Sequence, residues 1–171
     1  KAGIVGVWER PLIEPDRLTV AGLAQNHGYR TAAIGKWHLG WDWPLEQGDR
    51  PLLAQSQKGQ PRTGPANVAD AHRAAWRRIF TQPIQGGPTT RGFDTYFGTD
   101  VPNWPPFCFI EDNRTVGIPT TLLPPADFAD HQASVQGPAL AGWRLEAVLP
   151  ALRDRAVAFI DEAAKREQPF L

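Results

Sequence analysis

The sequence predicts an α/β fold, because amphipathic helical stretches alternate along the chain with short apolar stretches of strand type. We expect helices over residues 20–27, from 67 to about 80, and from 150 to about 165. Strands are expected over 29–34 and in a hairpin over 107–118. With 171 residues, the chain is long enough for one domain with a buried core.

The first helix has clear boundaries in the sequence. Thr19 is a suitable N-cap for a helix from Val20 to about His27, and Gly28 stands where a left-handed C-cap belongs. One face of this helix carries Val20, Leu23, Ala24 and His27. The strand from Tyr29 to Ile34 follows, and Gly35 is expected to end it.

Lys36 and His38 follow this strand and are the candidate catalytic residues. Side chains that lie two apart in an extended segment point the same way, so we expect both on one side, with Trp37 on the other. A fixed cation beside an imidazole can hold an oxyanion and move a proton. The alternative is a surface loop with an incidental lysine and histidine.

Trp41, Asp42 and Trp43 are candidate substrate-binding residues, because two aromatic rings flank a carboxylate beside this loop. Aromatic faces next to a polar group suit a sugar or aryl ring. The alternative is ordinary tryptophan packing. Residues 45–66 are rich in Gln, Gly and Pro and indicate a long surface excursion.

The second helix should begin at Asn67, with Asp70 in the capping-box position. Its expected buried stripe consists of Val68, Ala71, Ala75, Ile79 and Phe80, with Trp76 beside it. Its basic face, formed by Arg73, Arg77 and Arg78, could contact a polyanion, but an ordinary solvated face is the favoured interpretation.

The middle of the chain is expected to be a loop and then a hairpin. Residues 81–91 are a Pro/Gly loop, after which Phe93, Tyr96 and Phe97 should anchor the chain in the core. The strands of the hairpin, 107–111 and 114–118, bracket Asp112-Asn113. After an irregular stretch over 119–142, the third helix carries Pro150 in its first turn. Its expected stripe is Leu149, Leu152, Ala156, Phe159, Ile160 and Ala163.

The sequence offers no catalytic or metal-ligand partner for Cys108, His72 or His131. Cys108 has no adjacent base or cation, which indicates a buried hydrophobe rather than a nucleophile. His72 and His131 lack metal-ligand spacing to a second ligand. We therefore predict no metal ligand in this chain.

Composition excludes several classes of protein. The formal net charge is zero, which does not support a nucleic-acid partner, and no apolar run is long enough to cross a membrane. A single cysteine allows no internal disulfide. The chain contains no methionine, runs from Lys1 to Leu171 and shows no signal peptide, so we expect an internal fragment of a longer protein, cut at both ends.

One stretch resembles a known family. GYRTAAIGKWHLG, residues 28–40, resembles the second signature of the sulfatases, Gly-Tyr-x-Thr-x-x-x-Gly-Lys-Trp-His-Leu-Gly. RGFDTYFG, residues 91–98, is similar to the Gly-Phe-Asp-x-x-x-Gly segment that follows it in that family. Residues 168–171, Gln-Pro-Phe-Leu, are similar to a later Pro-Phe-Phe-Leu strand.

The resemblance implies that residues 1–171 are part of a sulfatase/alkaline-phosphatase-like domain with a central mixed sheet flanked by helices. It implies hydrolysis of a carbohydrate or aryl sulfate ester. It matches Lys36 to the lysine that contacts sulfate and His38 to the histidine that assists the formylglycine nucleophile. It also makes Asp100 and Asn103 candidate substrate contacts.

Other parts of a sulfatase site have no counterpart in the sequence. The Cys/Ser-x-Pro-x-Arg motif that yields formylglycine is absent, as are the acidic pairs that hold a divalent cation, usually calcium. Formylglycine and cation are therefore expected outside this chain, which alone should be inactive. The implied partner is a sulfated small molecule or glycan, and the implied location is periplasmic, secreted or lysosomal. Two alternatives remain: a phosphoester or phosphonate hydrolase of the same superfamily, and an inactive glycan-binding module.

Overall fold

A computed structural model describes residues 6–53, 68–123 and 135–171. The predicted α/β class is confirmed. The helices are α1 (Val20–Asn26), α2 (Arg50–Leu53), α3 (Asp70–Phe80) and α5 (Val148–Ala163), with 3-10 turns η1 (Pro88–Thr90) and η2 (Leu145–Ala147). The strands are β1 (Ala32–Lys36), β2 (Thr95–Thr99), β3 (Ile110–Glu111) and β4 (Arg114–Thr115).

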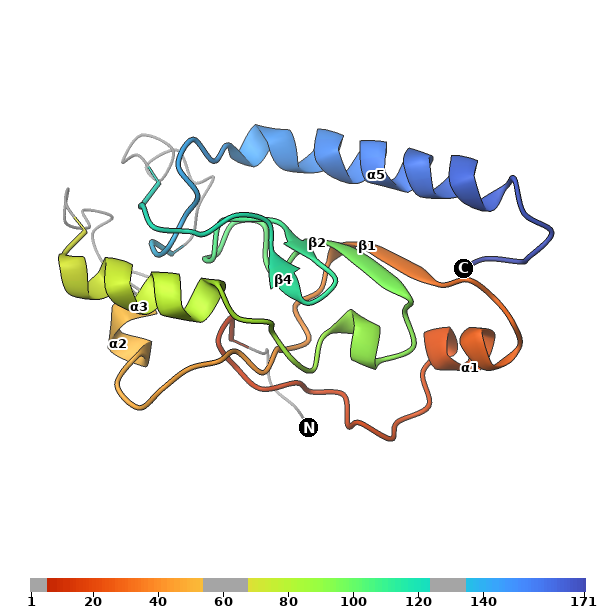
Figure 1. The fold of residues 1–171 in the computed structure, drawn as a ribbon, viewed down its shortest axis with the longest axis horizontal. Coiled ribbons are helices and arrows are strands. Elements are labelled where there is room, and N and C mark those ends of the chain that lie inside the picture. The colour runs from red at the N-terminus through yellow and green to blue at the C-terminus, as the bar shows by residue number, and fades with distance from the viewer. Residues whose placement is uncertain (1–5, 54–67, 124–134) are drawn as a thin grey trace.

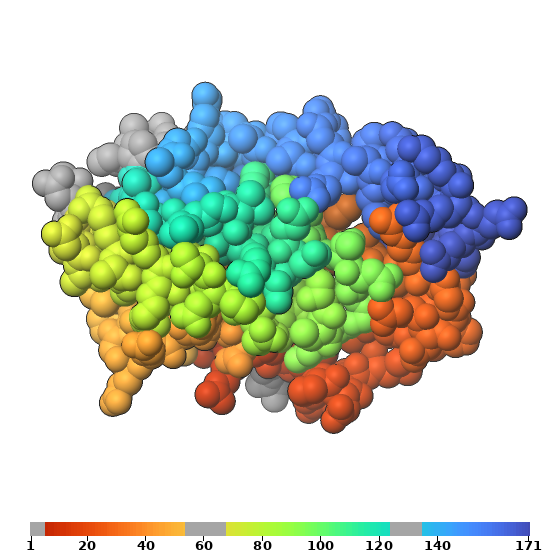
Figure 2. Space-filling model, in the orientation of Figure 1, coloured from red at the N-terminus to blue at the C-terminus, as the bar shows by residue number. Residues whose placement is uncertain are grey.

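The strands form one mixed sheet in the order β1-β2-β3-β4. β1 and β2 are parallel, with Ala32 opposite Thr95 and Lys36 opposite Thr99, whereas the other pairs are antiparallel. The expected central mixed sheet is therefore present. Just before β1, the Arg30 amide donates to Pro169 O at 2.8 Å, and Arg30 and Phe170 form an isolated parallel bridge; the C-terminal residues thus lie beside the start of β1 but do not form a strand of the sheet. Figure 2 shows the blue C-terminal residues meeting the orange residues around α1 at one end of the molecule.

Helices lie on both sides of the sheet (Figure 1). The alternation of side chains along β2 sends successive residues to opposite faces. Phe97 lies toward α5, where the Arg155 guanidinium stacks on its ring at 4.1 Å from the centroid. Tyr96 belongs instead to the main core cluster on the side of α3. The predicted core positions of Tyr96 and Phe97 are confirmed, and Phe93 is half-buried.

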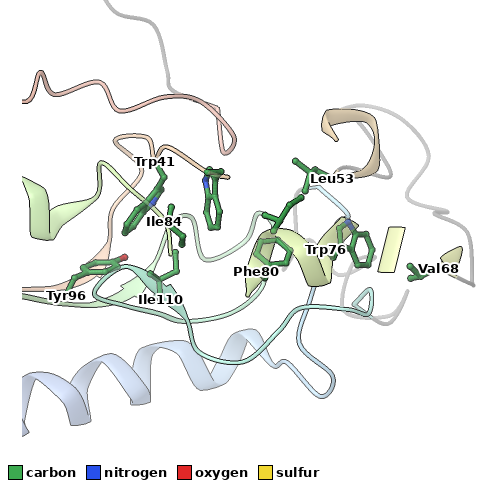
Figure 3. Packing of buried hydrophobic residues seen from close by; sticks show 10 residues of the cluster. Trp41, Leu53, Val68, Trp76, Phe80, Ile84, Tyr96 and Ile110 are labelled. Carbon is green, nitrogen blue, oxygen red and sulfur yellow. The ribbon is translucent and has the colours of Figure 1, made fainter. Parts of the chain in front are cut away.

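The main core is rich in aromatic side chains (Figure 3). Its buried members are Trp41, Trp43, Leu53, Val68, Trp76, Ile79, Phe80, Ile84, Tyr96 and Ile110. Trp41 and Tyr96 rings lie 5.6 Å apart, and Trp43 meets Phe80 edge-on at 5.8 Å. Such aromatic contacts contribute beyond the area that they bury. The core therefore joins the loop after β1 to α3 and to β2.

The first helix forms as predicted, but the prediction of its buried face is wrong. Thr19 Oγ1 accepts a hydrogen bond from Gly22 N at 2.9 Å, which confirms the N-cap, and Gly28 has a φ of +80°. However, Ala21 is the buried residue and Val20 is 71% exposed. The reason is a close backbone contact: a Cβ on Gly92 would lie 2.2 Å from Gly22 N, so the small residues of α1 face the sheet.

The first strand is displaced along the sequence. It begins at Ala32 and continues through Gly35 to Lys36, so the prediction that Gly35 ends it is wrong. β2 was not predicted as a strand. The pairing with β2 explains the extension of β1, because Gly35 pairs with Gly98 and Lys36 with Thr99, two residues beyond the expected end at Ile34.

The later helices differ from prediction mainly at their starts. α3 begins after Ala69, and the expected start at Asn67 lies outside the described residues. Ala71 is exposed, contrary to the predicted stripe, whereas Ala75, Trp76, Ile79 and Phe80 are buried. In α5, Ala163 is buried but Leu149 is 75% exposed, because η2 leads into the helix and buries Val148 instead.

The structure also bears on the predicted hairpin and on the predicted basic face of α3. The hairpin over Asp112-Asn113 is confirmed by the pairing of β3 with β4. Arg78 on the basic face of α3 is bonded to the buried Asp49 at 2.5 Å, which is a structural use of that cation. Most of the surface excursion, 54–66, and also His131 lie outside the described residues. Among the described residues, no helix is long and apolar enough to cross a membrane.

Candidate functional site

The candidate site lies at the carboxyl ends of the two parallel strands. Lys36 is the last residue of β1 and its side chain is exposed, and Thr99 opposite it is the last residue of β2. In open α/β sheets, ligands bind outside the carboxyl ends of parallel strands. The fold therefore puts Lys36 at the edge of the sheet where a ligand site is expected.

The loop after β1 turns sharply at His38. Trp37 N still bonds to Thr99 O at 3.0 Å, but His38 has a φ of +49°, in the left-handed region. The extended segment assumed for Lys36 and His38 therefore stops at Trp37, and strand alternation does not set the direction of the His38 side chain. His38 is half-buried, and Lys36 remains its neighbour at the strand end.

Several backbone contacts fix this loop. Trp37 Nε1 donates to Gly40 O at 3.1 Å, and Leu12 N donates to Leu39 O at 2.8 Å. Gly40 has a φ of +83°, and a Cβ there would lie 2.2 Å from Arg10 O. Only glycine fits this position without strain. The loop that carries His38 is thus held against the segment around residues 10–12.

Asp100 connects the loop to β2. Its Oδ1 accepts hydrogen bonds from His38 N at 3.1 Å and from Trp41 Nε1 at 3.2 Å. The side chain is buried, and Oδ2 has no hydrogen-bond partner among the described residues. Burial raises the pKa of Asp100 to about 7, although the two hydrogen bonds and the Lys36 charge act in the opposite direction. The carboxyl group faces the inside of the loop, so the expected direct contact between Asp100 and a substrate is not supported.

The Tyr96 hydroxyl links the carboxyl ends of β1 and β2. This hydroxyl lies 3.0 Å from Gly35 O and 2.9 Å from Thr99 O, and these two carbonyls share its one hydrogen. Burial, followed by the nearby Asp100, raises the pKa of Tyr96, so the hydroxyl stays protonated. A Cβ on Gly98 would lie 1.7 Å from Gly35 O, which means that the strands approach more closely than any side chain allows.

The turn after Asp100 places the Trp104 ring beside the His38 ring. Trp104 N bonds to Val101 O at 3.1 Å, and the Trp104 ring meets the His38 ring edge-on at 5.5 Å between centroids. Asn103, a predicted substrate contact, lies in this turn and is half-buried. The structure therefore brings together Lys36, His38 and the turn that contains Asn103.

The two tryptophans after the loop are core residues. Trp41 is 1% exposed and Trp43 is 5% exposed, so neither ring has a face available to a sugar or aryl group. The substrate-binding hypothesis for these two rings is corrected in favour of packing. Trp41 lies against Gly87, where a Cβ would be 1.8 Å from the ring. Asp42 is exposed and lines an open hollow of about 640 Å³ with Arg10, so its role stays a prediction.

Cys108 and His72 are packing residues in this structure. No group of three or more His, Cys, Asp or Glu among them could hold a metal ion. Cys108 is fully buried, and burial raises the pKa of its thiol, as expected for a packing residue. His72 lies on α3 against Trp76, with ring centroids 5.8 Å apart, and not at the strand ends. Lys36 and His38 therefore remain the candidate catalytic residues.

Comparison with known proteins gives a structural neighbour. No protein-family model matches the chain, and no curated protein matches it. A solved structure of a Bacteroides thetaiotaomicron sulfatase, from work on the metabolism of multiple glycosaminoglycans by that bacterium, matches with a TM-score of 0.62 and 19% identity. The match covers 98% of this chain and 35% of that chain. The chain therefore has a sulfatase-like α/β fold, and it spans about a third of the length of this neighbour.

The sequence did not reveal the residues that support the loop. Asp100 was singled out as a substrate contact, but its bonds to His38 and Trp41 depend on the parallel register of β1 and β2. The role of Tyr96 was also missed. An aromatic residue two positions before a glycine is typical of core packing, and nothing in the pattern indicates where its hydroxyl points.

Proposed function

We propose that this chain forms the part of a sulfatase active site that stabilises charge and handles protons during hydrolysis of a sulfate ester. The observation that carries the proposal is the position of Lys36 and His38 at the carboxyl end of a parallel strand, in a chain with a sulfatase-like fold. The proposed substrate is a carbohydrate or aryl sulfate. The products are an alcohol and sulfate.

Lys36 would bind the sulfate group. Breaking the bond between sulfur and the ester oxygen increases the negative charge on the leaving oxygen, and an ammonium held close to the reacting group stabilises that charge. A lysine suits this role because its charge is compact. Its place at the end of β1, fixed by pairing with Thr99, means that little reorganisation is needed when substrate binds.

His38 would hold and move a proton at the reacting group. Imidazole is the side chain that most often does this near neutral pH. The left-handed backbone at His38, bonded to Asp100, and the Trp104 ring beside the imidazole restrict its orientation. Restricted orientation is what proton transfer requires, because donor and acceptor must be within hydrogen-bond distance.

The resemblance also implies a formylglycine, whose hydrate would supply the nucleophile, and a divalent cation, which we propose is calcium. The described residues do not fit either group, since Cys108 is buried and no acidic cluster is present among them. Both groups would come from elsewhere in a longer protein. We predict a Cys/Ser-x-Pro-x-Arg motif upstream of Lys1 in the parent gene, and sequencing tests this. A threonine nucleophile with no such motif would favour phosphoester hydrolysis.

Steady-state hydrolysis of an aryl sulfate by the full-length, calcium-loaded and formylglycine-converted protein tests the proposal. Lys36→Ala should lower turnover about 10²–10³-fold, and His38→Ala about 10²–10⁴-fold. Matched controls are Lys165→Ala, at an exposed ion pair with Glu162, and His27→Ala, at the exposed end of α1. Both should retain turnover within about twofold.

The same assay separates the alternatives. Faster hydrolysis of an aryl phosphate than of an aryl sulfate would assign the protein to phosphoester hydrolysis. Binding of a sulfated glycan without turnover would favour an inactive binding module. Near-normal turnover by His38→Ala would mean that the proposed site is wrong.

A further inference from the structure

We propose that Asp100 is a positioning residue: it fixes the loop that carries His38 and so orients the imidazole for reaction. This inference rests on the proposed function of His38. It assigns to Asp100 an indirect role, because the side chain contacts the loop from within and not the reacting atoms. The inference depends on three features: the hydrogen bonds of Oδ1, the backbone conformation of His38 and the burial of the carboxyl group.

The first feature is the pair of hydrogen bonds to a single oxygen. Oδ1 accepts from the backbone of His38 at 3.1 Å and from the indole of Trp41 at 3.2 Å. These two donors lie on either side of the turn at Gly40. The carboxyl group thus closes the loop on itself and joins it to β2, the strand that precedes Asp100.

The second feature is the conformation that these bonds stabilise. His38 has a φ of +49°, in a region that residues other than glycine rarely adopt and that needs support from surrounding contacts. The hydrogen bond from His38 N to Asp100 acts on the same residue. Removing it should allow the backbone at His38 to relax, and the imidazole would move with it.

The third feature is the burial of Asp100. The side chain is 2% exposed, and Oδ2 has no hydrogen-bond partner among the described residues. Burying a carboxyl group with an unpartnered oxygen destabilises a fold, and such costs are typical of positions that have a functional use. The use that the contacts indicate is support of the loop.

A second carboxylate offers a matched control. Asp94, just before β2, accepts from Thr31 N at 2.8 Å, so it supports the start of β1 as Asp100 supports the segment after its end. Both residues bind a backbone amide of the neighbouring chain segment. Only Asp100 contacts the loop with His38. Loss of a hydrogen bond to a backbone amide is therefore common to both variants, whereas an effect on the loop with His38 should appear only at Asp100.

The experiment combines hydrogen exchange with kinetics in the full-length protein. Asp100→Ala should speed amide exchange in the segment around His38 at least tenfold and lower kcat at least tenfold, with KM within about threefold. Asp100→Asn keeps an acceptor oxygen for both hydrogen bonds, so exchange there should stay within about twofold of that of the unmodified protein. Asp94→Ala should leave exchange near His38 and kcat within about twofold.

Exchange measurements need no catalysis, so the inference can fail separately from the proposed function. Unchanged exchange near His38 in Asp100→Ala, or an equal increase in Asp94→Ala, would overturn it. If Asp100→Ala does not fold, Asp100→Leu decides, because leucine is close in shape but has no acceptor oxygen; exchange near His38 identical to that of the unmodified protein would then contradict the inference. If the unmodified protein hydrolyses no sulfate ester, the proposed function fails, and the exchange result still tests the support of the loop.

Discussion

Replacing Asp100 by asparagine should stabilise the protein at neutral pH much more than at acid pH. Asparagine has nearly the same shape and keeps one acceptor oxygen for His38 N and Trp41 Nε1. It differs in that it carries no charge at any pH. The substitution therefore isolates the free energy of keeping an ionised carboxylate in a buried position.

The magnitude follows from the pKa of Asp100, which burial raises from its ordinary value of 3.8 to about 7. Between these values the folded protein binds more protons than the unfolded chain. The stabilisation by the bound proton is therefore complete below pH 3.8 and is lost as pH rises to about 7. Each pH unit in this window corresponds to about 1.4 kcal/mol, so the free energy of unfolding should fall by about 2–3 kcal/mol between pH 5 and pH 7.

Denaturant unfolding of the full-length protein at these two pH values measures the effect. The gain in stability from Asp100→Asn should be about 2–3 kcal/mol larger at pH 7 than at pH 5. Tyr96 also interacts electrostatically with this carboxyl, and because its own pKa is raised above the ordinary value, its hydroxyl stays protonated at both pH values. A gain that does not change with pH would show that Asp100 is not charged at pH 7 or is not buried.

Asp94→Asn is the control for this measurement. Burial raises the pKa of Asp94, but hydrogen bonds from Thr31 N, the Gln25 amide and the Thr31 hydroxyl outweigh it, and the net pKa lies below the ordinary value. A carboxylate of this kind stabilises the fold above its unfolded pKa and loses that contribution only in stronger acid. The effect of Asp94→Asn should therefore be the same at pH 5 and pH 7.

Three further outcomes are expected. Gly98→Ala should destabilise the protein by about 1–3 kcal/mol in thermal or denaturant melts, because the new Cβ would overlap Gly35 O; an unchanged melt would contradict the close approach of the strands. Cys108 should resist alkylation at pH 8 until the protein unfolds, as mass spectrometry can show, since the thiol is buried and its pKa is raised. The 171-residue chain expressed alone should aggregate, because Val20 and Leu149 are exposed; a soluble monomer with a sharp melt would contradict this.

Local signals in the sequence were sufficient to predict some of the secondary-structure elements. Thr19 predicts the start of α1 because its hydroxyl binds the free Gly22 amide, and that interaction is set by neighbours in sequence. Asp112-Asn113 predicts the hairpin for the same reason. The buried face of α1 could not be predicted in this way, because it is set by the approach of Gly92 from a distant segment.

The same distinction between local signals and distant contacts applies to the residues of the candidate site. Lys36 and His38 could be predicted as candidates from spacing and resemblance, because both lie in one short segment. The burial of Trp41 depends on contact with Gly87, which is far away in the sequence, so a ligand-binding ring and a core ring were indistinguishable. The role of Asp100 depends on the register that places Thr99 opposite Lys36.

Three side chains from β2 and its two ends hold β1 and the residues that flank it in place. Asp94 holds the backbone before β1, Asp100 holds the backbone after it, and Tyr96 bonds to Gly35 O between them. All three supports come from β2 or its two ends, so β2 fixes β1 along its whole length. Stabilising a transition state electrostatically requires charges that are already in place before reaction. A short strand ending in Lys36 would be a poor scaffold by itself, and its attachment to β2 is what makes precise placement of that charge physically reasonable.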